Sequence, residues 1–140
     1  MAKKTDGALA DIPGPLHAHG YVPAHAAADA TLDHVIFRAP FACKVRKVSI
    51  MFGATLTGAD TNSANLNLIN RGADGLGTTE LANRDYASGT NDTAYVKRDH
   101  YAPASPLAVA QGVVLTMQRE KIGTGLATPD IHVQVEYEAN

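Results

Sequence analysis

The chain of 140 residues predicts an all-β protein: a jelly-roll-like antiparallel β-sandwich of about eight strands, preceded by an extended N-terminal arm. Three observations lead to this fold class. From Leu32 onward, short segments alternate apolar and polar residues. Turn-forming Gly, Asn, Asp and Pro residues separate these segments, and none has the stripe of an amphipathic helix. Strands with one apolar face need a second sheet to cover it, and a sandwich provides one. A Gln111-Gly112 turn before a long final strand favours a jelly roll over a barrel.

Residues 1–31 are the predicted arm, because they are rich in Ala, Gly and Pro and carry few large apolar side chains. They have neither the two-residue period of a strand nor the 3.6-residue period of a helix. Pro23 and the missing apolar stripe argue against a helix around the alanines 26–28. We therefore expect an extended segment that lies across another surface. The predicted β-sandwich domain spans residues 32–140 and should fold without residues 1–31.

The first half of this domain contains three well-marked strands. Residues 32–38 and 45–54 are rich in Val, Ile and Phe, and a corner at Pro40 separates them. Residues 62–70 follow a turn near Gly58 and alternate Ala or Leu with Ser or Asn. The alternation predicts that each of these strands buries one face.

The second half is less regular. A weaker strand is predicted at residues 79–86 and another at 93–98, with a strong turn signal at residues 88–92 between them. Residues 99–106 contain two prolines, which lack the N–H donor that a sheet needs, so they are predicted to form a loop or an edge. The remaining predicted strands are residues 107–110, 113–118 and 131–137.

Composition narrows the classes of function. Twelve basic and fourteen acidic residues give a net charge of −2, which offers no general attraction for nucleic acid or anionic lipid. The single cysteine, Cys43, has apolar neighbours and is predicted to be a small buried hydrophobic residue rather than a nucleophile. No segment approaches the length of a membrane span, and the N-terminus does not read as a signal peptide. We expect a protein made in the cytosol, with other proteins as its partners.

Several segments together resemble one class of viral protein. They are residues 37–48, 58–63, 66–70, 77–82, 123–126 and 133–137. Their residue pattern is similar to that of small β-sandwich proteins encoded beside the head genes of tailed bacteriophages. Several of these proteins are jelly-roll decoration, or cement, proteins. In order along the chain, the segments cover most of residues 35–137, and none is a catalytic motif.

The resemblance implies a structural protein of the virion, made in the host cytoplasm. Members of that class sit on the outer surface of the assembled capsid, commonly as homotrimers, and stabilise it by bridging subunits of the major capsid protein. A protein that binds only the assembled lattice stabilises that lattice by mass action, and no catalysed reaction is required. We accordingly predict no enzymatic activity, no cofactor and no bound metal.

Two groups of residues are the candidates for contacts with the capsid or with a neighbouring protomer. In the arm they are the larger apolar and the histidine residues, and after the Pro40 corner they are a basic cluster. Lys44 and Arg46 are expected on one strand face and Lys47 on the other. The full set is Ile12, Pro13, Leu16, His17, His19, Tyr21, Val22, His25, Lys44, Arg46 and Lys47.

Three alternatives remain open at this point. The first alternative is a transition-metal site. His17, His19 and His25 could supply imidazole ligands, but the sequence offers no fourth ligand and no fixed scaffold for them. A carbohydrate-binding or fibre-associated module of a phage particle would use exposed aromatic side chains, for which the candidates are Tyr86, Tyr95 and Tyr101. A shell subunit that self-assembles would form particles larger than a trimer.

Overall fold

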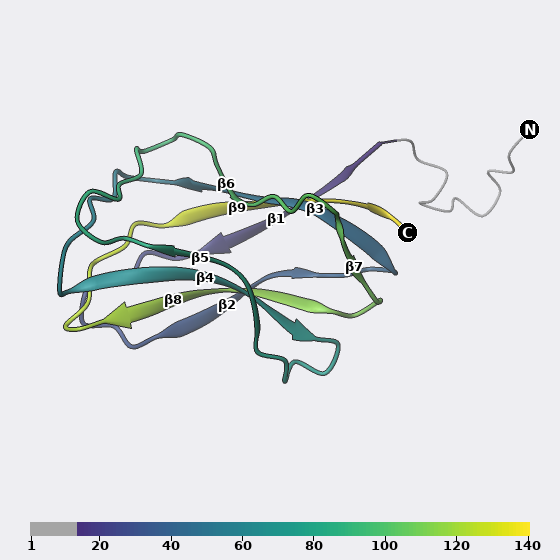
Figure 1. Ribbon diagram of the computed structural model, residues 1–140, viewed down its shortest axis with the longest axis horizontal. Helices are drawn as coiled ribbons and strands as arrows, with labels where there is room; N and C mark the ends of the chain where they lie inside the picture. The colour runs from purple at the N-terminus through teal and green to yellow at the C-terminus, as the bar shows by residue number, and fades with distance from the viewer. Residues whose placement is uncertain (1–13) are drawn as a thin grey trace, which may run out of the picture.

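Two antiparallel sheets face each other in the computed structural model of the chain, which describes residues 14–140 (Figure 1). The described residues contain strands and no helices, so no helix in this part of the chain could cross a membrane. The strands are β1 (Leu16–Val22), β2 (Leu32–Arg38), β3 (Cys43–Phe52), β4 (Ser63–Gly72), β5 (Thr79–Asp85), β6 (Arg98–Tyr101), β7 (Leu107–Val109), β8 (Val114–Ile122) and β9 (Ile131–Ala139).

The strands pair as nested hairpins. β4 pairs with β5, β3 with β6 and β7, β2 with β8, and β1 with β9. The resulting orders are β1-β9-β3-β6, which we call the β9 sheet, and β2-β8-β4-β5, which we call the β8 sheet. β6 and β7 share one position, because both pair with β3. This nested order is that of a jelly roll, so the predicted fold class is confirmed.

The sandwich begins earlier than we expected. β1 lies inside the stretch that was predicted to be an arm, so the boundary at Leu32 is corrected to Leu16. The inward positions of β1 alternate as in other strands, but Ala18 and Gly20 are too small to form a visible apolar stripe. A glycine is needed at position 20, because a Cβ atom there would lie 2.8 Å from the Cβ of Ile36 in β2. Residues 1–13 of the predicted arm lie outside the described residues.

The other deviation concerns the predicted strand at residues 93–98. Residues 93–97 form a turn instead, in which Tyr95 has a φ of 63°, a left-handed conformation that interrupts an extended chain. The strand β6 begins only at Arg98 and lies at the edge of the β9 sheet. An edge was one of the two predictions for residues 99–106. The other predicted strands coincide with observed ones, with shifted ends.

The core lies between the two sheets. Val48, Ile50 and Phe52 of β3 point inward as their alternation predicted, and so do Val133 and Val135 of β9. Cys43 is fully buried in this core, and burial raises the pKa of its thiol, so its prediction as a buried hydrophobic residue is confirmed.

Arg119 of β8 ties together two connections between the sheets. Its side chain is only 1% exposed, and its guanidinium donates to the carbonyl oxygens of Asp29 at 2.7 Å and Leu126 at 2.6 Å. Longer hydrogen bonds reach the carbonyls of Ala26 and Ala27. The β1–β2 connection and the β8–β9 connection are therefore held by one buried cation.

Candidate interaction surface

The outer face of the β9 sheet brings together the two groups of candidate residues. β9 lies between β1 and β3, so side chains from the predicted arm and from β3 lie on one continuous surface. The register aligns its outward residues in rows across the three strands. The rows are Tyr21, His132 and Met51; His19, Gln134 and Ser49; and His17, Glu136 and Lys47.

A β-bulge changes the expected arrangement of the basic cluster. The register of β3 against β9 shifts between Val45 and Lys47, so two residues of β3 oppose one of β9. In this register Lys47 lies opposite Glu136, whose side chain points outward, and Lys44 lies opposite Glu138. The prediction that Lys47 lies on the opposite face from Lys44 and Arg46 is therefore wrong: the bulge puts all three on the outer face.

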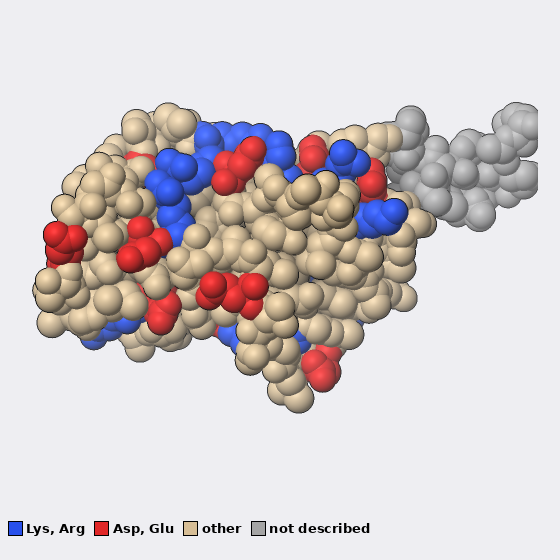
Figure 2. Space-filling model, in the orientation of Figure 1, with Lys and Arg blue, Asp and Glu red and all other residues tan. Residues whose placement is uncertain are grey.

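Ion pairs follow one side of this surface. Arg46 Nη1 lies 2.9 Å from Glu138 Oε2, Lys47 Nζ lies 3.5 Å from Asp99 Oδ2, and Lys97 also reaches Asp99. Figure 2 shows Lys and Arg side chains gathered over β6 and β3 at the top of the view, with acidic side chains between them. These pairs are largely exposed, so each stabilises the fold by only about 0–1 kcal/mol.

The middle of the surface is less charged and slightly hollow. A pocket of about 200 Å³ is lined by His19, Ser49, Met51, Lys97, His132, Val133 and Gln134. The ring of Tyr21 meets that of His132 edge-on, with centroids 5.6 Å apart, and Tyr21 is 52% exposed. An aromatic and Met-containing centre beside a charged rim is the anatomy of a protein–protein interface.

The sequence predicted only part of this surface. The alternation in β9 places His132, Gln134 and Glu136 on a polar face, but it contains no sign that β9 lies between β1 and β3. The alternation in β3 likewise places Met51 on the face opposite Ile50 and Phe52, but it does not show which strand lies beside it. The pairing order of distant strands is the missing information.

Three of the described candidate residues do not lie openly on this surface. Val22 is 1% exposed and belongs to the core, and Leu16 is half-buried. His25 is buried in the β1–β2 connection. Ile12 and Pro13 lie outside the described residues.

The outer face of the β8 sheet is different, because its polar side chains bond mainly to one another. Six side chains on this face form a continuous network, in which each one contacts the next through a hydrogen bond or, between Asp33 and Arg71, an ion pair. In order, they are Asn83, Asn67, Gln118, Asp33, Arg71 and Thr116. Their hydrogen-bonding capacity is largely used within the molecule, which leaves little for a partner.

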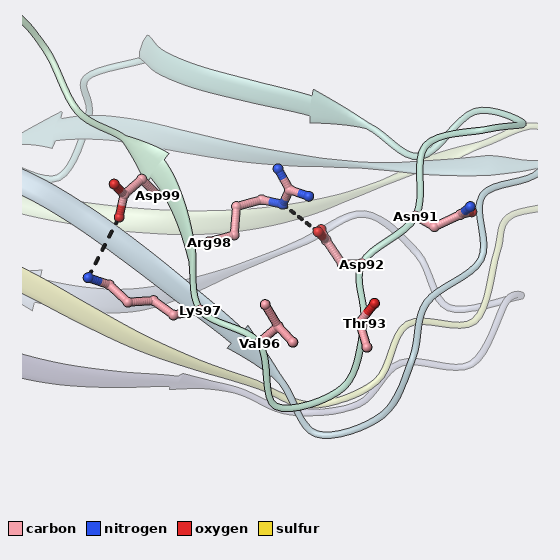
Figure 3. Close-up of a pocket in the computed structure, with 7 residues that line it drawn as sticks. All are labelled: Asn91, Asp92, Thr93, Val96, Lys97, Arg98 and Asp99. Carbon is pink, nitrogen blue, oxygen red and sulfur yellow. Dashed lines mark hydrogen bonds and ion pairs between the residues drawn. The ribbon is translucent and has the colours of Figure 1, made fainter.

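A second pocket lies beside β6, at the opposite edge from β1. Its volume is about 440 Å³, and Figure 3 shows the side chains that line it: Asn91, Asp92, Thr93, Val96, Lys97, Arg98 and Asp99. Asp92 is buried and forms ion pairs with Arg98 and, at 3.2 Å, with Arg84. It also accepts a hydrogen bond of 2.6 Å from the Tyr86 hydroxyl. Its charge is therefore compensated within the fold, and the cluster closes this edge of the sandwich.

Titration of the groups near Asp92 is shifted by burial. The pKa of the Tyr86 hydroxyl is raised by burial first and by its hydrogen bond to Asp92 second. The pKa of His100 is lowered to about 4, mainly by burial and then by the positive charge of Arg84. His100 Nε2 is buried without a hydrogen-bond partner. Both groups stay uncharged near neutral pH.

The tyrosines proposed as sugar platforms do not form one site. Tyr86 is buried, and Tyr101 is half-buried against the core. Tyr95 is 74% exposed, but it does not line the pocket beside β6. Within residues 14–140, no three His, Cys, Asp or Glu side chains are arranged as a metal site would require.

Comparison with known proteins finds the same fold in a virus particle. No family model and no curated protein matches this sequence. The structure is similar to a chain of the cyanophage Pam1 capsid asymmetric unit, with a TM-score of 0.58 and 16% sequence identity. That match covers 99% of this chain and 99% of the cyanophage chain, so the two are similar in length and share the fold throughout. A chain from the structure of infectious bursal disease virus Gx strain matches with a TM-score of 0.30 and 13% identity, over 89% of this chain and 36% of that one.

Proposed function

We propose that this protein is a structural component of a bacteriophage particle, and more specifically a decoration protein. In this role it binds the outer surface of the assembled capsid and stabilises it by bridging subunits of the major capsid protein. The observation that carries the proposal is the full-length structural match to a chain that belongs to a phage capsid asymmetric unit. A chain of nearly the same length and fold in a capsid supports a structural role rather than an enzymatic one.

The outer face of the β9 sheet is the surface we assign to this contact. Its centre contains Tyr21 and Met51, residue types that are enriched at interfaces, and the ring of His132 packs against that of Tyr21. The outer face of the β8 sheet is a poorer candidate, because its amide and charged groups already bond to one another. Docking there would break hydrogen bonds that the fold already makes.

Stabilisation of a shell by such a protein follows from mass action. A protein that binds only the assembled lattice lowers the free energy of that lattice by an amount that grows with occupancy. Many weak contacts on one shell also act together, because a protomer held at one contact is at high effective concentration for the next. We propose a homotrimer as the binding unit. Sizing by light scattering tests this state, and particles much larger than a trimer would point to a self-assembling shell subunit.

The direct test uses capsids of the encoding phage that were prepared without this protein. The purified protein should bind to them in a saturable way, and decorated capsids should survive heating that disrupts undecorated ones. Electron microscopy of the decorated particles should place the protein on the outer surface. If the protein does not bind and the particles resist heat equally well without it, the proposed function is wrong.

Tyr21→Ala tests the assigned face. Truncating an aromatic side chain at the centre of an interface costs about 2 kcal/mol or more, so capsid affinity should fall by about 30-fold or more. Tyr95→Ala is the matched control, because Tyr95 is also exposed but lies on the turn before β6. If Tyr95→Ala weakens binding and Tyr21→Ala does not, the contact involves that turn instead of the β9 sheet.

A further inference from the structure

Two histidines meet at the end of the sandwich where the β1–β2 and β8–β9 connections cross between the sheets. His25 lies in the β1–β2 connection and His34 in β2, and their Nε2 atoms are 2.8 Å apart. Their ring centroids are 5.0 Å apart. The difference between this distance and the Nε2–Nε2 distance is close to the sum of the two ring radii, so the two nitrogens lie nearly on the line between the ring centres. The rings therefore face each other head-on, as in a hydrogen bond, and do not converge on a third point as metal ligands would.

His25 is held in place on three sides. Its backbone exchanges two hydrogen bonds of 2.9 Å with Thr128 of the β8–β9 connection. Its Nδ1 lies 3.4 Å from Asp29 Oδ2, and that oxygen accepts a hydrogen bond from the Ala26 amide. The side chain of His25 is 5% exposed, so the ring has little space to turn away from His34.

The hydrogen-bonded pair can accept only one additional proton. Asp29 favours a proton on Nδ1 of His25, so its Nε2 accepts the Nε2–H of neutral His34. One added proton can be accommodated, because His34 can carry it on Nδ1 while a single proton stays between the two Nε2 atoms. A second added proton would give both Nε2 atoms an N–H. Two donors cannot share a gap of 2.8 Å, so the rings must then separate.

We propose that the His25–His34 pair is an acid-sensitive latch that releases the β1–β2 connection, residues 23–31, when both imidazoles become fully protonated. Asp29 lies beside His25, and Arg119 and Lys121 of β8 bind backbone carbonyl oxygens of the same connection. Asp29 compensates one positive ring but not two. Opening relieves the clash of donors and the repulsion between the two charged rings.

This latch differs from general acid unfolding because its first effect is local. Residues 23–31 follow β1, and the His25–His34 hydrogen bond joins two side chains, so it is not one of the backbone hydrogen bonds that pair the strands of either sheet. The connection should therefore open while the two sheets remain paired. Hydrogen exchange separates these possibilities, since it reports each segment's opening individually.

The test compares amide protection factors, corrected for intrinsic exchange, at about pH 7 and about pH 4.5, because burial and then the neighbouring His25 lower the pKa of His34 below the ordinary histidine value. Protection in residues 23–31 of the full chain should fall by at least about tenfold, while protection in β9 changes less. His34→Gln should abolish this local loss, because its amide can still donate to His25 Nε2 but does not titrate. His132→Gln, on the exposed face of β9, is the matched control and should behave as the unmodified protein. The proposal is wrong if residues 23–31 and β9 lose protection to the same extent at the lower pH. It is also wrong if residues 23–31 lose as much protection in His34→Gln as in the unmodified protein.

Discussion

At the scale of single residues, Arg119 is the most consequential polar side chain in the sandwich. Its guanidinium donates to carbonyl oxygens from two separate connections and is itself buried. No carboxylate forms an ion pair with it among the described residues, so backbone dipoles compensate its charge. Burial is also the main cause of the lowered pKa of this group.

We expect Arg119→Met to destabilise the protein by about 3 kcal/mol or more, because it removes the donor from several partly buried carbonyl oxygens. Arg119→Lys should also destabilise it, since one ammonium group cannot reach both connections. Urea unfolding measures both effects. Arg38→Met is the control, because Arg38 is exposed and its replacement should change stability by less than about 0.5 kcal/mol. Equal stability of the Arg119 and Arg38 variants would show that the buried hydrogen bonds contribute little.

His100 makes stability depend on pH. Its pKa is about 4 in the folded protein and near 6.5 in the unfolded chain, so the unfolded chain binds the proton more readily. Stability from this group is complete above pH 6.5 and is lost as the pH falls toward 4. The linkage relation gives a loss of about 2 kcal/mol between about pH 7 and about pH 5.

Unfolding by urea at these two pH values should show that loss in the unmodified protein and a smaller one in His100→Gln. His132→Gln should lose as much stability as the unmodified protein, because His132 is exposed. A loss that is the same in all three proteins would assign the acid sensitivity to other groups.

At the scale of elements, β1 decides where the folded unit begins. It covers the edge of β9 and places Val22 in the core, so it is part of the sandwich and not an appendage. Deletion of residues 1–31 should therefore destabilise the protein by more than about 3 kcal/mol, because it removes buried apolar surface and uncovers a sheet edge. This reverses the expectation that the domain folds without residues 1–31.

Deletion of residues 1–13 is the matched comparison, and it should leave the urea midpoint close to that of the full chain. Both truncated proteins should be measured for secondary structure by circular dichroism and for self-association by light scattering. If the chain without residues 1–31 has the stability of the chain without residues 1–13, the pairing of β1 with β9 is not important for folding.

Strands with large alternating side chains could be predicted from the sequence, and strands with small ones could not. In β3 and β9 the inward residues are Val, Ile, Phe and Tyr, so a local pattern is enough. In β1 the inward residues include Ala18 and Gly20, and the approach of Ile36 from β2 leaves no room for a side chain at Gly20. That requirement comes from a strand packed against it in the other sheet, and no local pattern contains it.

The candidate surface shows the same limit. Lys44, Arg46 and Lys47 could be identified as a cluster, but their common face depends on a bulge in the pairing of β3 with β9. The neighbouring positions of Tyr21, His132 and Met51 depend on the pairing of three strands from distant parts of the chain. Such pairing is a property of the whole jelly roll.

At the scale of the whole molecule, the two sheets offer different outer faces. The face of the β8 sheet is a network of amide and charged groups that bond to one another. The face of the β9 sheet has an aromatic centre, and the charges at its rim nearly balance. The basic members of that rim are Lys44, Arg46, Lys47 and Lys97, and the acidic members are Asp99, Glu136 and Glu138.

This balance leads to a prediction about salt. If the proposed attachment to the capsid depends on the centre of the β9 face, affinity should fall by less than about tenfold between about 0.1 M and about 1 M NaCl, because screening acts on the rim charges alone. Lys44→Glu, which changes only the rim, should mainly slow association and increase the dependence on salt. Capsid binding followed over this range of salt measures both effects. If binding disappears at moderate salt in the unmodified protein, the basic cluster and not the aromatic centre holds the protein to the shell.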